Sequence, residues 1–276
     1  MIKTACHVHS DWSYDGKWSL PKVAAAFQRR GYRVVMMTEH DRGFTEVRRL
    51  EHREACARAS SDAMLVVPGI EYSDAENMVH VLVWGPVPFL GEGVPTADLL
   101  NKVEAANGVA VLAHPSRKDA WQSFSLCWSK HLLGVEIWNR KTDGWAPSRS
   151  APSLLAGTPL VQFVGLDFHD QRQFFPLAME IEIAPPFTED TVLEHLKTRR
   201  CRATAFGLRV SQTWYPTTLP FLRLAERCRR RLASTYRRIA IPAVGPARGE
   251  LPLAAEPNRA AHSSTAPREV SRRLGS

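Results

Sequence analysis

The sequence predicts an α/β fold in which buried strands alternate with helices, as in a (β/α) barrel or a doubly wound sheet. Two observations carry this prediction. Short apolar runs, each closed by a turn residue, are typical of buried parallel strands, and stretches with helical periodicity lie between several of them. A third observation concerns function, because histidine, aspartate and glutamate recur where these strands end.

The expected elements follow one another along most of the chain. Strands are expected at residues 3–7, 33–38, 64–70, 79–84, 108–113, 134–138 and 160–166. Helices are expected at residues 22–30, 46–59 and 96–106. In a (β/α) barrel the active site is built at the C-terminal ends of the strands, so functional side chains are expected there.

The first strand ends in the pair His7 and His9, with Asp15 in the loop that follows. Two histidines at i and i+2 on a strand point to the same face, where they are well placed to hold a metal. The later strands repeat the pattern, with His40, Glu71, His80, His114, Asp167 and His169 at or near strand ends. Imidazole and carboxylate without thiolate suit Zn²⁺, Mn²⁺ or Fe²⁺. This many ligands exceeds the need of one four-coordinate zinc, so we expect two or three divalent ions, with Glu71 as a bridging carboxylate.

Six short motifs within residues 1–206 resemble those of the PHP (polymerase and histidinol phosphatase) family of metal-dependent phosphoesterases. They are His7-Val8-His9-Ser10 with Asp15-Gly16, Thr38-Glu39-His40-Asp41, Pro68-Gly69-Ile70-Glu71, His80-Val81-Leu82, Ala113-His114-Pro115 and Gly165-Leu166-Asp167-Phe168-His169. Glu39 departs from the family pattern, in which Asp is commoner, and Leu166 and Phe168 stand where small residues are common. None of these departures removes a ligand.

The resemblance implies a distorted seven-stranded (β/α) barrel of PHP type with a trinuclear metal site. Carried over by position, the first metal takes His7, His9, Glu71 and Asp167, the second takes Glu71, His80 and His114, and the third takes Asp15, His40 and His169. The implied activity is that of a phosphoric ester hydrolase, which cleaves small phosphomonoesters or nucleotides with a metal-bound hydroxide. Glu71, which links two metals, and Asp167, which faces the nucleophile and accepts its proton, are the expected catalytic residues.

Three arginines are candidates for substrate binding because each closely follows a strand end. Arg42, Arg117 and Arg140 present guanidinium groups that suit phosphate oxygens, although loop arginines are often simply solvated. Two other functions stay open. One is an exonuclease or nucleotide phosphodiesterase whose basic tail binds nucleic acid. The other is a non-catalytic module that binds metal for stability, against which the complete ligand set argues.

The net charge of +8 is carried by one end of the chain. Residues 1–213, the expected barrel, contain 24 basic and 24 acidic residues, whereas residues 214–276 contain 12 arginines and four glutamates. In this second part a basic helix is expected at residues 219–241, and the Pro-, Ala-, Ser- and Arg-rich segment after Pro242 is expected to be disordered. A basic helix can contact nucleic acid or an acidic membrane surface, or it can pack on the barrel as a solvated terminal helix.

The remaining composition predicts a cytoplasmic protein. No stretch has the apolar length of a membrane span, and a strand expected at residues 3–7 is incompatible with a signal peptide. Five cysteines without a CxxC motif suit a reducing compartment. The sequence leaves the native metal, the leaving group and the oligomeric state open.

Overall fold

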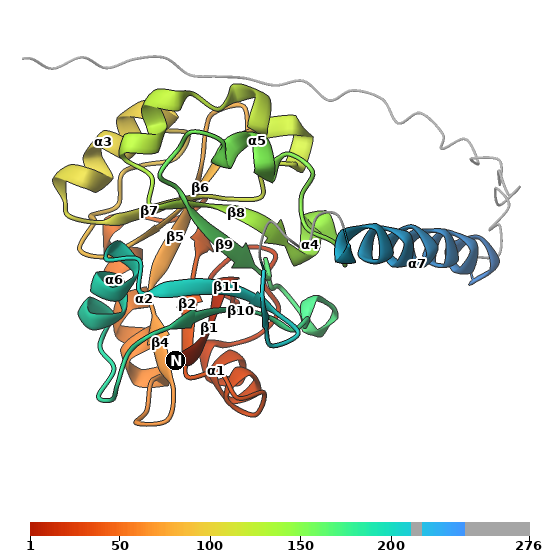
Figure 1. The fold of residues 1–276 in the computed structure, drawn as a ribbon. Coiled ribbons are helices and arrows are strands. Elements are labelled where there is room, and N and C mark those ends of the chain that lie inside the picture. The colour runs from red at the N-terminus through yellow and green to blue at the C-terminus, as the bar shows by residue number, and fades with distance from the viewer. Residues whose placement is uncertain (211–216, 241–276) are drawn as a thin grey trace, which may run out of the picture. The chain divides into compact units, whose positions relative to one another are not determined.

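Two mixed six-stranded sheets form the framework of the computed structural model (Figure 1), which describes residues 1–210 and 217–240. The first sheet has the order β12 (Leu208–Arg209), β11 (Cys201–Ala205), β10 (Leu177–Ile181), β1 (Ile2–Val8), β2 (Val34–Met37) and β4 (Leu65–Val67). The second has the order β3 (Glu39–His40), β5 (Gly69–Ser73), β6 (His80–Trp84), β7 (Val109–Leu112), β8 (Gly134–Asn139) and β9 (Val161–Gly165). The expected mixed α/β class is therefore confirmed.

The two sheets are joined at the ends that carry the predicted ligands. One residue separates β2 from β3, and one separates β4 from β5, so these pairs pass from one sheet into the other. The end of β9 also meets the end of β1: the Leu166 amide donates to the Cys6 carbonyl at 3.1 Å, and the Phe168 amide donates to the His7 carbonyl at 3.1 Å. The closed seven-stranded barrel stays a prediction, because the strands are divided between two six-stranded sheets.

The expectation that the buried strands are parallel is wrong for part of the structure. β6 pairs antiparallel with β5 and with β7, and β10 pairs antiparallel with β1 and β11. The connection between β5 and β6 covers only residues 74–79, whereas a parallel crossover needs a dozen or more residues. The reversal of β6 brings its first residue, His80, to the end of the sheet where the neighbouring strands carry their ligands.

The helices are α1 (Leu20–Gln28), α2 (Glu46–Ala59), α3 (Thr96–Ala105), α4 (Arg140–Asp143), α5 (Ala151–Leu155), α6 (Glu189–Lys197) and α7 (Thr218–Ala240), with short 3-10 helices at Arg117–Ser123, Leu126–Lys130 and Gln171–Gln173. α2 has the expected bounds because Thr45 caps it, accepting a hydrogen bond from the Arg48 amide at 3.2 Å. α1 begins two residues earlier than expected, since Pro21 suits a first helical turn. The segment expected at residues 219–241 corresponds to α7, while the expected disordered tail lies outside the described residues.

A continuous apolar core packs between the strands that carry the predicted site. Trp84 and Trp138 are its largest fully buried side chains. The Trp84 indole donates to the Met37 carbonyl at 2.8 Å, which ties β6 to β2. Residues Met1–Leu232 form one compact unit, and the predicted boundary between residues 213 and 214 stays a prediction. No helix of the described residues combines the length and the apolar character needed to cross a bilayer.

Candidate metal centre

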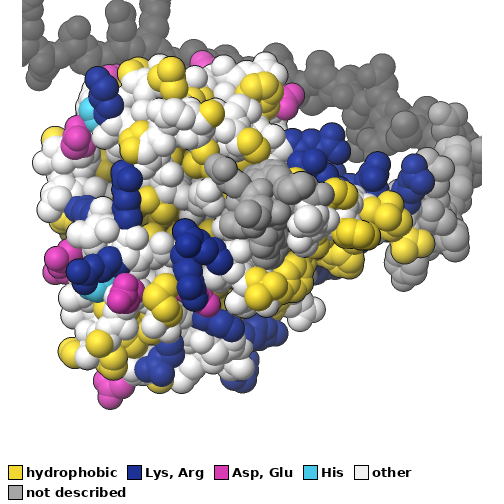
Figure 2. Space-filling view, in the orientation of Figure 1, with side chains coloured by type: hydrophobic (Ala, Val, Ile, Leu, Met, Phe, Trp, Pro, Cys, Tyr) yellow, Lys and Arg dark blue, Asp and Glu magenta, His cyan; other side chains and the backbone are white. Residues whose placement is uncertain are grey.

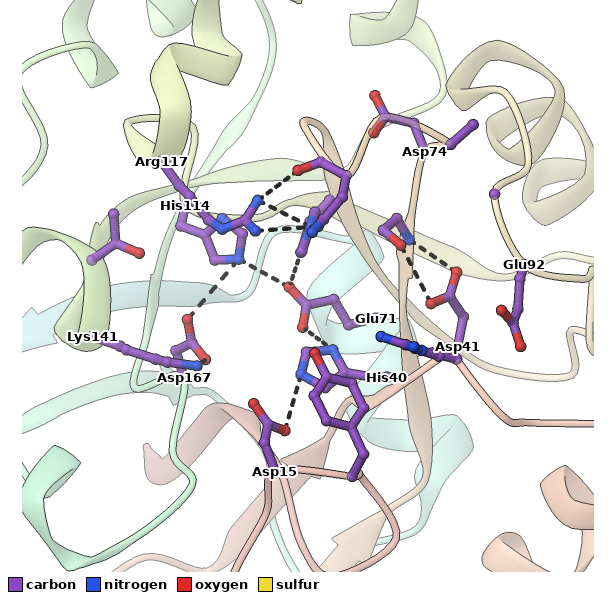
Figure 3. Close-up of a pocket in the computed structure, with 18 residues that line it drawn as sticks. Asp15, His40, Asp41, Glu71, Asp74, Glu92, His114, Arg117, Lys141 and Asp167 are labelled. Carbon is purple, nitrogen blue, oxygen red and sulfur yellow. Dashed lines mark hydrogen bonds and ion pairs between the residues drawn. The ribbon is translucent and has the colours of Figure 1, made fainter. Parts of the chain in front are cut away.

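All nine side chains predicted as metal ligands converge in one place, and Figure 3 shows the part of it that opens into a pocket. They come from β1 (His7), the loop after it (His9 and Asp15), β3 (His40), β5 (Glu71), β6 (His80), the loop after β7 (His114) and the loop after β9 (Asp167 and His169). Seven are buried, and His40 and Asp15 are partly exposed. Ligands far apart in the sequence meet because they lie toward the same end of the two sheets, which His80 reaches at the start of the reversed strand β6.

Glu71 lies at the centre of the cluster, with its side chain only 1% exposed. Its Oε1 lies 2.8 Å from His80 Nδ1, 2.9 Å from His114 Nε2 and 3.4 Å from His7 Nε2. Its Oε2 lies 3.1 Å from His40 Nδ1 and 3.4 Å from His9 Nε2. A carboxylate whose two oxygens face separate groups of imidazoles has the arrangement that a bridging ligand requires.

Four overlapping groups have ligand atoms within 4.8 Å of one another, which is close enough to share an ion. They are His7 with His9 and Glu71; His7 with His114 and Asp167; Glu71 with His80 and His114; and His9 with His40 and His169. Asp15 adjoins the last group, with oxygens 3.3 Å from His40 Nε2 and 3.0 Å from His169 Nε2. These overlapping groups are similar to the three sets of metal ligands that the family resemblance implies.

The donor set fits divalent metal because several of its buried polar atoms make no hydrogen bond and instead face one another. Within the described residues, these atoms have no hydrogen bond: His7 Nε2, His9 Nε2, Asp15 Oδ1, His40 Nε2, Glu71 Oε2 and His114 Nδ1. A buried polar atom without a partner is costly, and several in one cluster are unusual. Shared ions would satisfy these nitrogen and oxygen atoms together, with ligands of the type that Zn²⁺, Mn²⁺ or Fe²⁺ prefers.

Glu136, which the sequence analysis missed, orients the first ligands. Its Oε1 lies 2.9 Å from His7 Nδ1, and its Oε2 accepts hydrogen bonds from the His114 amide at 2.8 Å and from Asn139 Nδ2 at 2.9 Å. Because Glu136 contacts Nδ1 of His7, the other ring nitrogen, Nε2, is directed into the cluster, as a ligand histidine requires. Gly165 permits this approach, since a Cβ there would clash with the Glu136 carboxylate. A glutamate inside the apolar strand 134–138 was the available sequence signal.

A second buried carboxylate, Glu39, holds the loop that carries His9. Its oxygens accept hydrogen bonds from the hydroxyls of Ser10 at 2.6 Å and Ser13 at 2.5 Å. Ser13 Oγ in turn lies 3.2 Å from His9 Nδ1. His52 is buried beside Glu39, with its Nε2 at 3.6 Å, and is a core residue rather than a ligand. Glu39, noted as a departure from the family pattern, thus has a structural role in positioning a ligand.

Opposite charges raise or lower the pKa of several groups in the cluster, whereas burial and the neighbouring His40 and His169 lower the pKa of His9. Burial alone lowers the pKa of His7, but the carboxylates of Glu136 and Glu71 raise it well above its ordinary value. Burial also opposes ionisation of Glu71, yet the neighbouring histidines hold its pKa well below the usual range. The pKa of Asp167 is lowered to about 2 despite burial, by His7 and Lys141 among others. Both carboxylates are therefore ionised at neutral pH, and a metal bound at His7 would displace the proton that its raised pKa retains.

The ligands open into a pocket of about 410 Å³ whose walls carry three cationic side chains, Arg42, Arg117 and Lys141. Arg117 is held by the Asn77 carbonyl, to which its Nη1 donates at 2.9 Å, and it lies 3.2 Å from His80 Nε2. Arg42 lies with its guanidinium carbon 5.7 Å from the Tyr14 ring centroid. The structure thus places two of the three predicted substrate-binding arginines around the metal centre.

Arg140 does not line this pocket, contrary to the expectation for it. Its guanidinium carbon lies 5.2 Å from the centre of the Phe175 ring, and its Nη2 donates to the Arg172 carbonyl at 3.5 Å. The preceding residue, Asn139, points into the cluster, so Arg140 is turned away from it. Its neighbour Lys141, which the sequence analysis missed, reaches the cluster instead, with Nζ 3.3 Å from Asp167 Oδ1.

Comparison with known proteins identifies the fold. Neither a protein-family model nor a curated protein sequence matches the chain. A two-domain protein from Bacteroides vulgatus ATCC 8482 that contains a predicted PHP-like metal-dependent phosphoesterase is similar, with 16% identity and a TM-score of 0.54 over 82% of this chain and 69% of that one. PsfC from Pseudomonas syringae PB-5123 has 13% identity and a TM-score of 0.56 over 84% of this chain and 98% of its own. The chain therefore has a PHP-like fold, and the resemblance found in its motifs is confirmed at this level.

Proposed function

We propose that this chain is a metal-dependent hydrolase and, within that class, a phosphoesterase that acts on small phosphomonoesters or nucleotides. The convergence of nine imidazole and carboxylate side chains, several with buried atoms that make no hydrogen bond, supports the metal dependence. The cations Arg42, Arg117 and Lys141 around the same pocket support an anionic substrate. The PHP-like fold agrees with both features.

One ion would be held by Glu71, His80 and His114. A second would be held by His7, His9, Asp167 and Glu71, and a third by Asp15, His40 and His169. When bound, divalent ions acidify a coordinated water and neutralise phosphoryl oxygens. The protein supplies rigid ligands, and Glu136 and Glu39 hold the imidazoles in the required orientation.

The side chains of the pocket have separate roles in the proposed reaction. Arg117 and Lys141 bind the non-bridging oxygens of the substrate and orient the phosphorus atom, with Arg42 at the pocket wall. Water attacks phosphorus, the bond from phosphorus to the leaving oxygen breaks, and the ionised carboxylate of Asp167 accepts the proton that the water loses. This assignment suits Asp167 because it lines the pocket and its Oδ1 lies 3.8 Å from both His7 Nε2 and His9 Nε2.

A chelation experiment tests the proposal against its alternatives. Purified protein is assayed with p-nitrophenyl phosphate, bis-p-nitrophenyl phosphate, a nucleoside monophosphate and a single-stranded oligonucleotide, before and after removal of metal and after its return. We expect metal-dependent release of phosphate from the monoesters. Faster turnover of the diester or the oligonucleotide would instead favour the phosphodiesterase or exonuclease. Chelation that lowers thermal stability, with no hydrolysis of any substrate by the loaded protein, would establish the non-catalytic module.

Two arginines provide a matched pair for the substrate pocket. Arg117→Met removes a guanidinium that lines the pocket, whereas Arg140→Met removes one that lies on Phe175 outside it. Losing a charge-assisted contact to phosphate should raise KM by roughly tenfold or more. We expect this loss for Arg117→Met alone, and equal effects of the two substitutions would contradict the assignment of the pocket.

A further inference from the structure

Helix α7 packs against the rest of residues Met1–Leu232 through one face. Leu219 is buried, and Leu222 packs against the hydrophobic core. Glu226 is also buried, and its Oε2 accepts a hydrogen bond from the Trp145 amide at 3.1 Å. These three positions recur at a spacing of three and four residues, so they define the inner face of the helix.

The opposite face of α7 carries a second apolar row that the described chain leaves uncovered. The row consists of Phe221, Leu224, Cys228 and Leu232, which we call the α7 stripe. Phe221 is 74% exposed, Leu224 53% and Leu232 71%, and Cys228 is also exposed. Their spacing of three, four and four residues aligns them along one side of the helix. Figure 2 shows hydrophobic side chains collected along α7, with basic side chains beside them.

The charges around the stripe are of one sign. Arg227 and Arg231 lie one turn apart along one edge of it, whereas Arg229, toward the other edge, is paired with Glu226 at 2.6 Å. The only acidic residue between Thr218 and Leu232 is Glu226, which is on the inner face. A row of apolar side chains bordered by arginines, without an exposed carboxylate, is therefore the surface that α7 presents.

We propose that the α7 stripe docks onto an anionic phospholipid surface. Helices of this kind lie in the bilayer interface, where the apolar side chains enter the headgroup region and the arginines bind lipid phosphates. A second copy of this chain fits less well, because pairing two stripes would bring their bordering arginines together. Nucleic acid fits less well, because it would engage the arginines and leave Phe221 and Leu224 in water.

A fluorophore on the stripe tests this proposal directly. Cys228 is labelled with a polarity-sensitive dye in the full chain, with Cys127→Ser and Cys201→Ser to prevent other labelling; Cys6 and Cys56 are buried. We expect a blue shift of emission with vesicles that contain phosphatidylglycerol and none with phosphatidylcholine alone. The matched control is a second variant, with Cys201→Ser and Cys228→Ser, that carries the dye on Cys127, which is exposed outside α7; its emission should not change.

Substitutions then test the contribution of the apolar row. The double variant Phe221→Asp, Leu224→Asp should weaken partitioning into anionic vesicles on the order of a hundredfold, because each large apolar side chain contributes about tenfold or more when buried. Leu208→Asp is the control, since Leu208 is 64% exposed on β12. Circular dichroism checks that the variants remain folded.

Four outcomes would overturn the proposal. They are the absence of partitioning, partitioning without a blue shift at Cys228, a blue shift that grows with protein concentration in the absence of lipid, and a blue shift produced by an oligonucleotide. The second outcome would leave only an electrostatic contact through other arginines. The third would assign the stripe to self-association, and the fourth to nucleic acid.

Discussion

Replacing Glu71 by Gln tests the centre of the proposed mechanism. The substitution preserves the size of a side chain that is 1% exposed, but it removes a negative charge that faces five histidine nitrogens at 2.8 to 3.4 Å. It also replaces one oxygen by an amide nitrogen, which carries no lone pair for a metal. A glutamine can therefore ligate through one atom only and cannot bridge two ions.

The expected loss follows from the number of contacts that depend on this charge. Removing one preorganised electrostatic group at an active site typically lowers kcat by a factor of about 10²–10³. Glu71 belongs to two of the four ligand groups, and its two oxygens face histidines of the other two as well, so we expect a loss of kcat/KM on the order of 10³-fold or more. That loss is equivalent to about 4 kcal/mol, at 1.36 kcal/mol for each factor of ten.

The assay combines hydrolysis of p-nitrophenyl phosphate with elemental analysis of the same preparations. Glu104→Gln is the control, because Glu104 also contacts a histidine, with its Oε2 2.7 Å from His131 Nδ1, but at an exposed site on α3. Glu71→Gln should lose activity and bound metal while keeping its circular dichroism spectrum, and Glu104→Gln should match the original protein. Activity and metal content close to the original in Glu71→Gln would refute the bridging role.

Three further predictions concern metal content, the C-terminal helix and pH. The protein should carry two or three divalent ions per chain and His7→Ala should carry fewer; elemental analysis that finds at most one ion per chain in the original would reject the multinuclear site. Truncation between Gly207 and Thr213 should keep most turnover of a nucleoside monophosphate but lower the melting temperature by several degrees, because buried Leu219 is lost; a folded truncation without activity would place α7 in the active site. Although burial opposes it, hydrogen bonds from Arg229 and Arg230 lower the pKa of Glu226 to about 2, so its stabilising contribution is present above about pH 4.5 and is lost as the pH falls toward 2. Urea unfolding should show this dependence in the original protein and a flatter one in Glu226→Gln, and identical profiles would contradict it.

Local chemistry made α1, α2, α3 and several strands predictable, whereas α4, α5 and α6 were not predicted. The bounds of α2 follow from Thr45, whose side chain accepts the first free amide. The ligand-bearing ends of β1, β3, β5 and β7 were predictable because each apolar run stops at a polar residue or a turn. The direction of β6 was missed, although the short segment 74–79 between Glu71 and His80 allows only a hairpin-like return.

Contacts between distant segments account for what the sequence did not show. Glu136 lies 129 residues from His7 and Lys141 lies 26 residues from Asp167, so no local periodicity relates these partners. Arg140 and Lys141 are adjacent and carry the same charge, and both follow a strand. Because α4 begins at Arg140, the side chain of Lys141, and not that of Arg140, faces the proposed metal ligands.

Three of the proposed ligands have a strained backbone conformation that no sequence pattern reveals. His7, Asp167 and His114 have φ values of 60°, 50° and 23°, in the left-handed region that residues with a Cβ rarely adopt. Such conformations cost on the order of 1–3 kcal/mol each and persist where surrounding contacts impose them. Glycine would relieve the strain at each position but would provide no ligand. Glu136 contacts both His7 Nδ1 and the His114 amide, so one buried carboxylate stabilises two strained ligands. The same residues therefore lower the stability of the strand ends and would hold the proposed metal ions, which is the pattern expected where function, rather than folding, determines the residue.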